Sequence, residues 1–144
     1  MIKPIDIILA DDHTLVRRTI RALLHSKGAF EVVAEAADGQ EALQLVDQLH
    51  PTVAILDVRM PKVDGIEATR RMRKLPSPPK VLVLSVFATR DVVFKAFEAG
   101  CIAYVLKGHA QELGEAIHAA LAGRRFLSTP LRHLEPELEA RFGR

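Results

Sequence analysis

The stretch Ile5-Asp6-Ile7-Ile8-Leu9-Ala10-Asp11-Asp12, close to the start of the chain, indicates the fold class. It joins an aliphatic run, typical of a strand buried on both faces of a sheet, to two adjacent aspartates. A helical pattern follows at once, because apolar residues recur at helical spacing from Val16 to Leu24 and end before Gly28. The stretch therefore predicts a buried strand that leads through an acidic turn into a helix.

The same alternation of apolar run and helical pattern recurs four more times. Further strands are predicted at 30–36, 53–56, 80–84 and 102–106, and further helices at 42–49, 66–75, 92–99 and 113–120. Strictly alternating strands and helices predict right-handed crossovers and a parallel sheet. Five such units fit an open, doubly wound α/β sheet better than a closed barrel, which typically needs about 250 residues.

Length and composition narrow the class of protein further. The chain has 144 residues, of which 49% are hydrophobic and 26% charged, as in one globular domain. Its formal net charge of +2 is too small to argue for nucleic-acid binding from bulk charge. The lone Cys101 cannot form an internal disulfide, and the apolar runs are far shorter than the roughly 18 residues of a membrane span. We therefore expect a soluble, cytoplasmic protein without membrane contact.

The C-terminal part differs in composition from the rest. Residues 124–144 contain five Arg against three Glu, and Pro130 and Pro136 interrupt them. We expect residues 1–123 to form the domain. Residues 124–144 are predicted to be a linker outside the core, or the start of a C-terminal helix near 134–142, towards an output domain that is missing from this chain.

Polar residues stand where the predicted strands end, which is where open parallel sheets bind ligands. Asp11 and Asp12 follow the first strand and Asp57 the third, while Ser85 and Lys107 end the fourth and fifth. Three crowded carboxylates repel one another unless a cation compensates, and their oxygens suit Mg²⁺. A carboxylate can also attack phosphorus to give an aspartyl phosphate. Lys107 would then neutralise the transferred group, and Ser85 would donate a hydrogen bond to it.

Several segments, taken in order, resemble the receiver domain of two-component response regulators. They are Ala10-Asp11-Asp12-His13, Asp38-Gly39-Gln40-Glu41-Ala42-Leu43, Leu56-Asp57-Val58-Arg59-Met60-Pro61, Asp64-Gly65, Val83-Leu84-Ser85 and 100–107. The resemblance covers about residues 5–123. It implies a flavodoxin-like sheet of five strands in the order 2-1-3-4-5 with five helices. It also implies a module that accepts a phosphoryl group from a histidine kinase and changes shape, and that is not an enzyme beyond this self-modification.

The resemblance also implies roles for individual residues around the phosphoryl group. Asp57 would be the phosphoacceptor, Ser85 the switch hydroxyl, Lys107 the phosphate-binding lysine and Tyr104 the aromatic coupled to Ser85. Asp12 and Asp57 would be direct ligands of Mg²⁺, and Arg59 would contribute its main-chain carbonyl. Asp11 would be a further ligand or would orient the ion through a water.

Two bulky residues are expected to control how long the phosphoryl group lasts. Arg59 lies two positions beyond Asp57, and Phe87 lies two positions beyond Ser85. Both would flank the path of a hydrolytic water. We therefore expect them to slow dephosphorylation.

Gly108 directly after Lys107, residues 12–17 and residues 122–128 resemble the subfamily with a LuxR-type helix-turn-helix output. This implies transcriptional control, with DNA contacted only through the missing output domain, and a homodimer on phosphorylation. The expected dimer face comprises Leu15 and Ala22 of the first helix and Ala119 and Ala122 of the fifth. A rival surface is the fourth helix, where Phe94 and Phe97 turn away from the centre of the apolar stripe.

Other readings stay open at this point. The chain could be a stand-alone receiver that acts through protein contacts. A Mg²⁺-dependent phosphatase of the haloacid-dehalogenase type would need its acid two residues after Asp11, where His13 stands. A flavin or nucleotide module would need a phosphate-binding loop where Asp11 and Asp12 would repel phosphate. We expect His13 to start the first helix rather than bind metal, because imidazole suits zinc better than magnesium.

Overall fold

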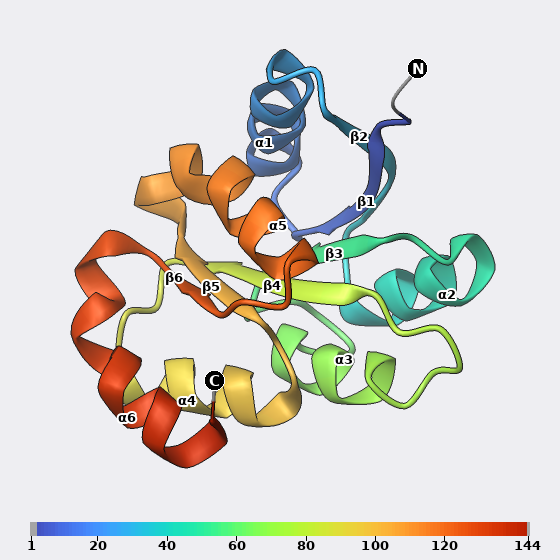
Figure 1. Ribbon diagram of the computed structural model, residues 1–144. Helices are drawn as coiled ribbons and strands as arrows, with labels where there is room; N and C mark the ends of the chain where they lie inside the picture. The colour runs from blue at the N-terminus through green and yellow to red at the C-terminus, as the bar shows by residue number, and fades with distance from the viewer. Residues whose placement is uncertain (1–2, 144) are drawn as a thin grey trace.

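A parallel β-sheet runs through the centre of the computed structural model, which describes residues 3–143 (Figure 1). The strands lie in the order β2-β1-β3-β4-β5-β6, and every neighbouring pair is parallel. Their bounds are β1 Ile5–Ala10, β2 Phe30–Ala36, β3 Val53–Leu56, β4 Lys80–Ser85, β5 Ala103–Leu106 and β6 Phe126–Leu127. The chain goes from β1 to one side and then returns to the other, so the topological switch point lies between β1 and β3.

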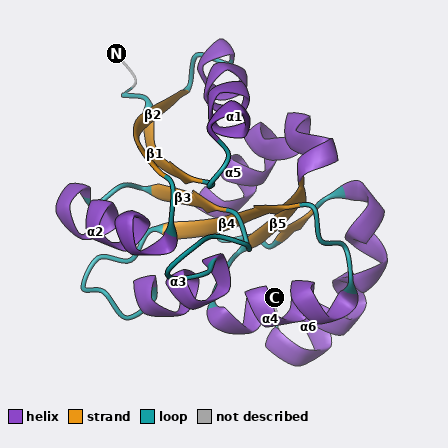
Figure 2. Ribbon diagram, turned by 180° about the vertical axis from the view of Figure 1, so that it is seen from behind, coloured by secondary structure: helices purple, strands orange, loops and turns teal. Residues whose placement is uncertain are grey.

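Helices cover both faces of this sheet (Figures 1 and 2). The α-helices are α1 Thr14–Ser26, α2 Gly39–Leu49, α3 Gly65–Met72, α4 Arg90–Ala99, α5 Leu113–Leu121 and α6 Glu135–Phe142. Two 3₁₀ helices, η1 Lys107–Glu112 and η2 Thr129–Leu134, precede α5 and α6. Helices α1 and α5 pack on one face, and α2, α3, α4 and α6 pack on the other.

Alternation along each strand builds the two halves of the core. In β1, Ile7 and Leu9 pack with α1 and α5, whereas Ile8 and Ala10 pack with the helices of the other face. Both faces of this strand are therefore apolar, as expected of a strand with helices on both sides. No helix within residues 3–143 is long and apolar enough to cross a membrane.

The predicted α/β, flavodoxin-like fold is confirmed, but the predicted numbers of five strands and five helices are wrong, since residues 3–143 form six strands and six α-helices. The sheet has six strands because Phe126 and Leu127 pair with Ala103 and Tyr104 of β5. A strand of two residues is too short to produce a periodic signal in the sequence.

The C-terminal segment also differs from the expected linker outside the core. Leu131, Leu134 and Leu138 are buried in the same cluster as residues of α4, so this segment completes the domain rather than leaving it. The short helix suggested near 134–142 is present as α6. It covers the outer side of α4, where the rings of Phe94 and Phe142 lie 6.4 Å apart between centroids. Phe94 and Phe97 are consequently buried.

Candidate functional site

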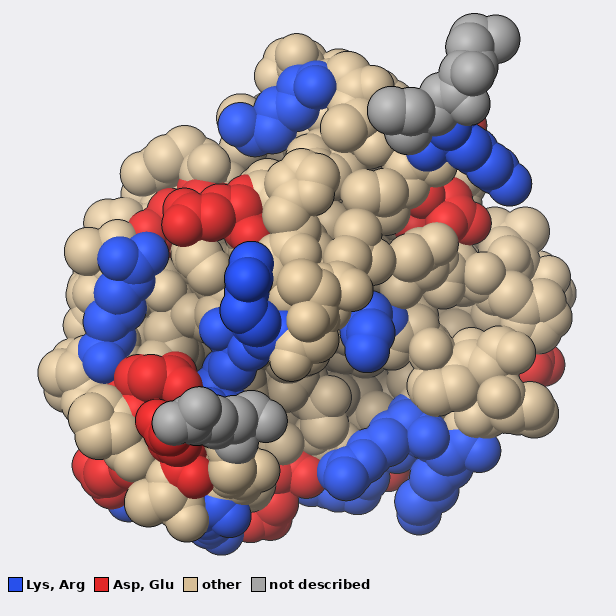
Figure 3. Space-filling model, viewed as in Figure 1, with Lys and Arg blue, Asp and Glu red and all other residues tan. Residues whose placement is uncertain are grey.

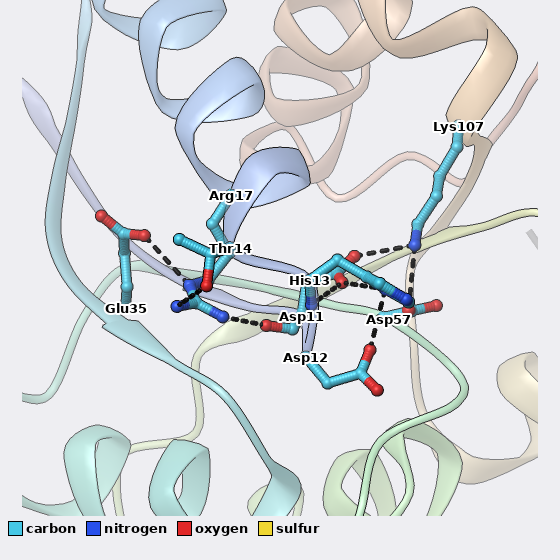
Figure 4. A network of polar contacts seen from close by, with 8 residues as sticks. All are labelled: Asp11, Asp12, His13, Thr14, Arg17, Glu35, Asp57 and Lys107. Carbon is cyan, nitrogen blue, oxygen red and sulfur yellow. Dashed lines mark hydrogen bonds and ion pairs between the residues drawn. The ribbon is translucent and has the colours of Figure 1, made fainter.

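The predicted site residues meet at the carboxyl ends of the central strands (Figure 4). Asp11 directly follows β1, Asp57 directly follows β3, and Lys107 directly follows β5. The ammonium Nζ of Lys107 lies 2.8 Å from Asp11 Oδ2 and 3.0 Å from Asp57 Oδ2. One lysine therefore bridges two carboxylates that belong to different strands.

Backbone contacts fix the aspartates in place. The amide of Asp11 donates to Ala36 O, and that of Asp57 donates to Ala10 O, each at 3.0 Å, so sheet pairing continues into the site. After Asp57 the chain turns sharply, and the amide of Gly65 donates to Val58 O at 2.8 Å. A Cβ on Gly65 would lie 1.9 Å from Asp57 O, so only glycine permits this close approach.

Burial and charge determine the ionisation of the two strongest partners. Burial, together with the nearby charge of Asp11, raises the pKa of Asp57, although the hydrogen bond from Lys107 opposes this shift. Burial lowers the pKa of Lys107, but its contacts with Asp11 and Asp57 outweigh burial and leave the pKa raised. Lys107 therefore stays protonated, and its single positive charge faces the carboxylates of Asp11 and Asp57. That imbalance favours a further cation at the site.

The acidic cluster has the composition of a cation site. Asp11, Asp12, His13 and Asp57 each offer a ligand atom, and these atoms lie within 4.8 Å of one another. Carboxylate oxygens are the donors that a hard divalent cation such as Mg²⁺ prefers, so the residues fit that ion. The cluster could therefore hold a metal ion.

His13 does more than start the first helix. It occupies the N-cap position of α1, as predicted, but its Nδ1 also lies 3.2 Å from Asp11 Oδ1 and 3.0 Å from Asp12 Oδ1. The side chain is 67% exposed and stands at the open side of the cluster. The sequence alone did not assign it to the site, because its ring reaches the carboxylates only through the geometry of the turn.

Ser85, Phe87 and Tyr104 form a second connected group beside Asp57. Ser85 Oγ accepts a hydrogen bond from the amide of Phe87 at 3.0 Å, and the Tyr104 hydroxyl donates to Phe87 O at 2.7 Å. Ser85 and Tyr104 are fully buried. Burial raises the pKa of Tyr104 to about 12, against the lowering effect of the neighbouring Ser85 hydroxyl. The two residues predicted to form a switch therefore both contact the main chain of Phe87, in the loop before α4.

The two residues predicted to flank the water path are in contact. The guanidinium carbon of Arg59 lies 4.9 Å from the centroid of the Phe87 ring, a cation–π arrangement. The two side chains reach each other from the loops after β3 and β4.

The residues expected at a dimer face divide into two groups. Leu15 is 74% exposed, and Ala22 and Ala122 are also exposed. Ala119 differs from expectation, since it is only 9% exposed and packs in the core between the sheet and α1 and α5. Ala119 belongs to the same buried cluster as Phe126 of β6, the strand that the sequence did not predict.

Fold and site together define a class: a flavodoxin-like α/β protein whose switch point holds aspartates and a lysine around a possible cation site. Comparison with known protein families identifies one family within this class. Residues 7–118 match the response regulator receiver domain, and the chain belongs to that family.

Individual relatives agree with this family. The chain is 38% identical over 138 residues to the transcriptional regulatory protein LiaR of Bacillus subtilis (strain 168), which covers 95% of this chain and 60% of that protein. A crystal structure of a LuxR-family two-component response regulator from Aurantimonas sp. SI85-9A1 is 37% identical, with a TM-score of 0.87 over 96% of this chain and 99% of that one. RcsB dimers bound to DNA contain a similar chain at 26% identity and a TM-score of 0.82, over 92% of this chain and 68% of that one.

These relatives are response regulators of two-component systems, and transcriptional regulators of LuxR type are among them. The chain spans 60% of the length of LiaR and 55% of that of DegU from Brevibacillus brevis.

Proposed function

We propose that this chain is a phosphorylation-activated receiver in which Asp57 accepts a phosphoryl group from a sensor histidine kinase. The observation that carries the proposal is the buried Asp57 carboxylate, which lies 3.0 Å from Lys107 Nζ beside the acidic turn of Asp11 and Asp12. Membership of the receiver family supports the same assignment.

The chemistry follows from the groups present. An oxygen of the Asp57 carboxylate attacks phosphorus, a P–O bond forms, and the bond from phosphorus to the donor breaks with its electron pair leaving on the donor. Asp11, Asp12, Asp57 and the Arg59 carbonyl would hold Mg²⁺, which when bound neutralises charge on the phosphoryl oxygens. Lys107 donates hydrogen bonds to the transferred group once its contact with Asp57 is exchanged.

The response would run through Ser85 and Tyr104. The phosphoryl group brings charge and acceptor oxygens, which attract the Ser85 hydroxyl. Ser85 accepts a hydrogen bond from the amide of Phe87, and Tyr104 donates one to the carbonyl of the same residue. A shift of Ser85 would therefore change the positions of Phe87 and Tyr104. Their common loop leads directly into α4.

The output we propose is transcriptional control through a LuxR-type DNA-binding domain outside this chain, in the cytoplasm. Basic and acidic side chains are scattered among uncharged residues on the face in Figure 3, and the net charge of the chain is +2. Such a surface offers little electrostatic attraction for DNA. DNA contact is therefore assigned to the output domain.

For the homodimer we propose the face formed by α1 and α5. Leu15 on α1 and Leu121 on α5 are exposed large apolar residues, and Ala22 on α1 and Ala122 directly after α5 are also exposed. The rival face on α4 is less accessible because α6 covers Phe94 and Phe97.

Intact-mass measurement tests the phosphoacceptor. With a small acyl phosphate and Mg²⁺, the protein should gain the mass of one phosphoryl group, and chelation of Mg²⁺ should prevent this. Asp57→Asn should gain none, whereas Asp47→Asn, which removes an exposed carboxylate on α2, should behave like the parent. Labelling of Asp57→Asn at the parental level would contradict the assignment.

A further inference from the structure

A second polar network lies behind the acidic turn, on the side away from Asp57 (Figure 4). Arg17 of α1 donates through Nη1 to the main-chain carbonyl of Asp11 and through Nε to Glu35 Oε1, the latter at 3.1 Å. Glu35 lies on the neighbouring strand β2, opposite Leu9 of β1. One guanidinium therefore ties the end of β1 to β2 and to the first turn of α1.

The Arg17–Glu35 pair is better shielded from water than a typical surface ion pair. Arg17 is 15% exposed and Glu35 24%, whereas Arg21, which contacts the other oxygen of Glu35 at 2.7 Å, is 46% exposed. Burial raises the pKa of Glu35, but its hydrogen bonds with Arg21 and Arg17 outweigh burial and leave the pKa lowered. An ionised, forked arginine contact of this kind fixes orientation more firmly than a single hydrogen bond.

The carbonyl that Arg17 contacts belongs to the turn that carries the acidic side chains. Asp11 and Asp12 leave this turn towards Asp57, and the carboxylates repel one another. The amide of Asp11 is already held by Ala36 O, and a contact at the carbonyl further restricts any movement of the carboxylates away from one another. Arg17 opposes that movement from the side away from Asp57. Its guanidinium is itself held by Glu35 of the adjacent strand β2.

We propose that Arg17, oriented by Glu35, is a positioning residue for the cation site. It sets the direction of the Asp11 and Asp12 carboxylates and thereby the affinity for Mg²⁺, without touching the ion. The inference rests on the proposed function, since it assigns a determinant of the Mg²⁺ site proposed there.

Charge and geometry predict opposite results when Arg17 is replaced. Removing a positive charge near a cation site should tighten binding of Mg²⁺ by simple electrostatics. Loss of positioning should weaken it, and loss of a group that orients metal ligands typically weakens binding by about 10–100-fold. The sign of the change therefore separates the two effects.

The experiment is a titration with Mg²⁺ alone, followed by calorimetry or by amide chemical shifts, on the parent, Arg17→Met and Arg21→Met. Arg21 is the matched control because it also pairs with Glu35 from α1, and within residues 3–143 it makes no hydrogen bond or ion pair with Asp11. We expect the dissociation constant of Arg17→Met to rise about tenfold, near the low end of that range. Arg21→Met should stay close to the parent, and melting temperatures without Mg²⁺ record the loss of stability in each variant.

Glu35→Gln provides a second variant if Arg17→Met folds poorly. It leaves the arginine in place but removes the charge that orients it, so we expect a smaller rise in the dissociation constant. Unchanged or tighter Mg²⁺ binding in Arg17→Met, or an equal loss in Arg21→Met, would overturn the inference while leaving the proposed function intact. A parent protein that binds no Mg²⁺ would overturn both.

Discussion

Phe87 connects the phosphoryl site to its surroundings through both its main chain and its side chain. Its amide and carbonyl contact Ser85 and Tyr104, and its ring stacks with the guanidinium of Arg59. Hydrolysis of an aspartyl phosphate needs a water in line with phosphorus, and the stacked pair would cover that approach. Under the proposed function, the ring would affect the lifetime of the phosphoryl group, and the main chain would take part in the response.

Replacing the Phe87 ring tests the lifetime directly. Phe87→Ala keeps both main-chain contacts but opens the water path, so dephosphorylation should accelerate severalfold. Val86→Ala is the matched control, because Val86 is an exposed apolar neighbour. The decay of the phosphoryl group is followed by intact mass after removal of the donor. A decay rate in Phe87→Ala equal to that of the parent would refute the shielding.

Ser85→Ala separates phosphorylation from the response. The hydroxyl is not needed for attack by Asp57, so the variant should still accept one phosphoryl group. It should respond weakly, because the link from the phosphoryl group to Phe87 and Tyr104 passes through Ser85. Amide spectra before and after phosphorylation measure the response at Phe87 and along α4. Shifts as large as those of the parent would show that Ser85 does not couple the two.

Helix α6 shows how one element alters the surface of another. It fills the outer side of α4 with Leu138, while Arg90 of α4 pairs with Glu137 and Arg141 pairs with Glu98. The apolar contact dominates, because exposed ion pairs contribute little to stability.

The contribution of α6 to the stability of the domain can be measured with Leu138→Ala. Removal of this fully buried side chain should cost about 2–5 kcal/mol in the free energy of unfolding. Leu49→Ala, which trims an exposed leucine of α2, should cost much less. Urea unfolding of both variants gives the comparison. Equal, small losses would mean that α6 is not part of the cooperative domain.

The elements predicted well are those with long apolar patterns. The first five strands follow from aliphatic runs, and the site follows from the polar residues at the ends of β1, β3, β4 and β5. Pro130 and Pro136 suggest interruptions of the C-terminal segment, yet each lies in the first turn of its helix, η2 or α6, where proline is tolerated. The contact of Arg17 with Asp11 and Glu35 was not predictable, because it requires the pairing of β1 with β2 and the rotation of α1.

Helix α6 covers α4, so the face formed by α1 and α5 is the more exposed of the two apolar surfaces. Phosphorylation should therefore promote a dimer through α1 and α5, as far as the phosphoryl group stabilises the associating state. Phe94→Glu is not a clean test of the rival face, since it would bury a charge beneath α6.

Ala22→Glu places a charge on the exposed face of α1 and should weaken self-association of the phosphorylated protein. Leu49→Glu, an equally disruptive change at an exposed position of α2, should leave it unchanged. Sedimentation of the phosphorylated variants distinguishes them. Loss of the dimer in Leu49→Glu but not in Ala22→Glu would exclude the α1 and α5 face.

We predict that the phosphoryl group resides on Asp57, and chemical mapping can locate it. The protein is phosphorylated with an acyl phosphate and Mg²⁺ and then reduced with borohydride, which converts an aspartyl phosphate into homoserine. Peptide mass spectrometry then identifies the modified residue. We predict homoserine at position 57 alone, in a peptide that is unmodified when Mg²⁺ is chelated. Homoserine at position 11 or 12, with Asp57 intact, would contradict the account.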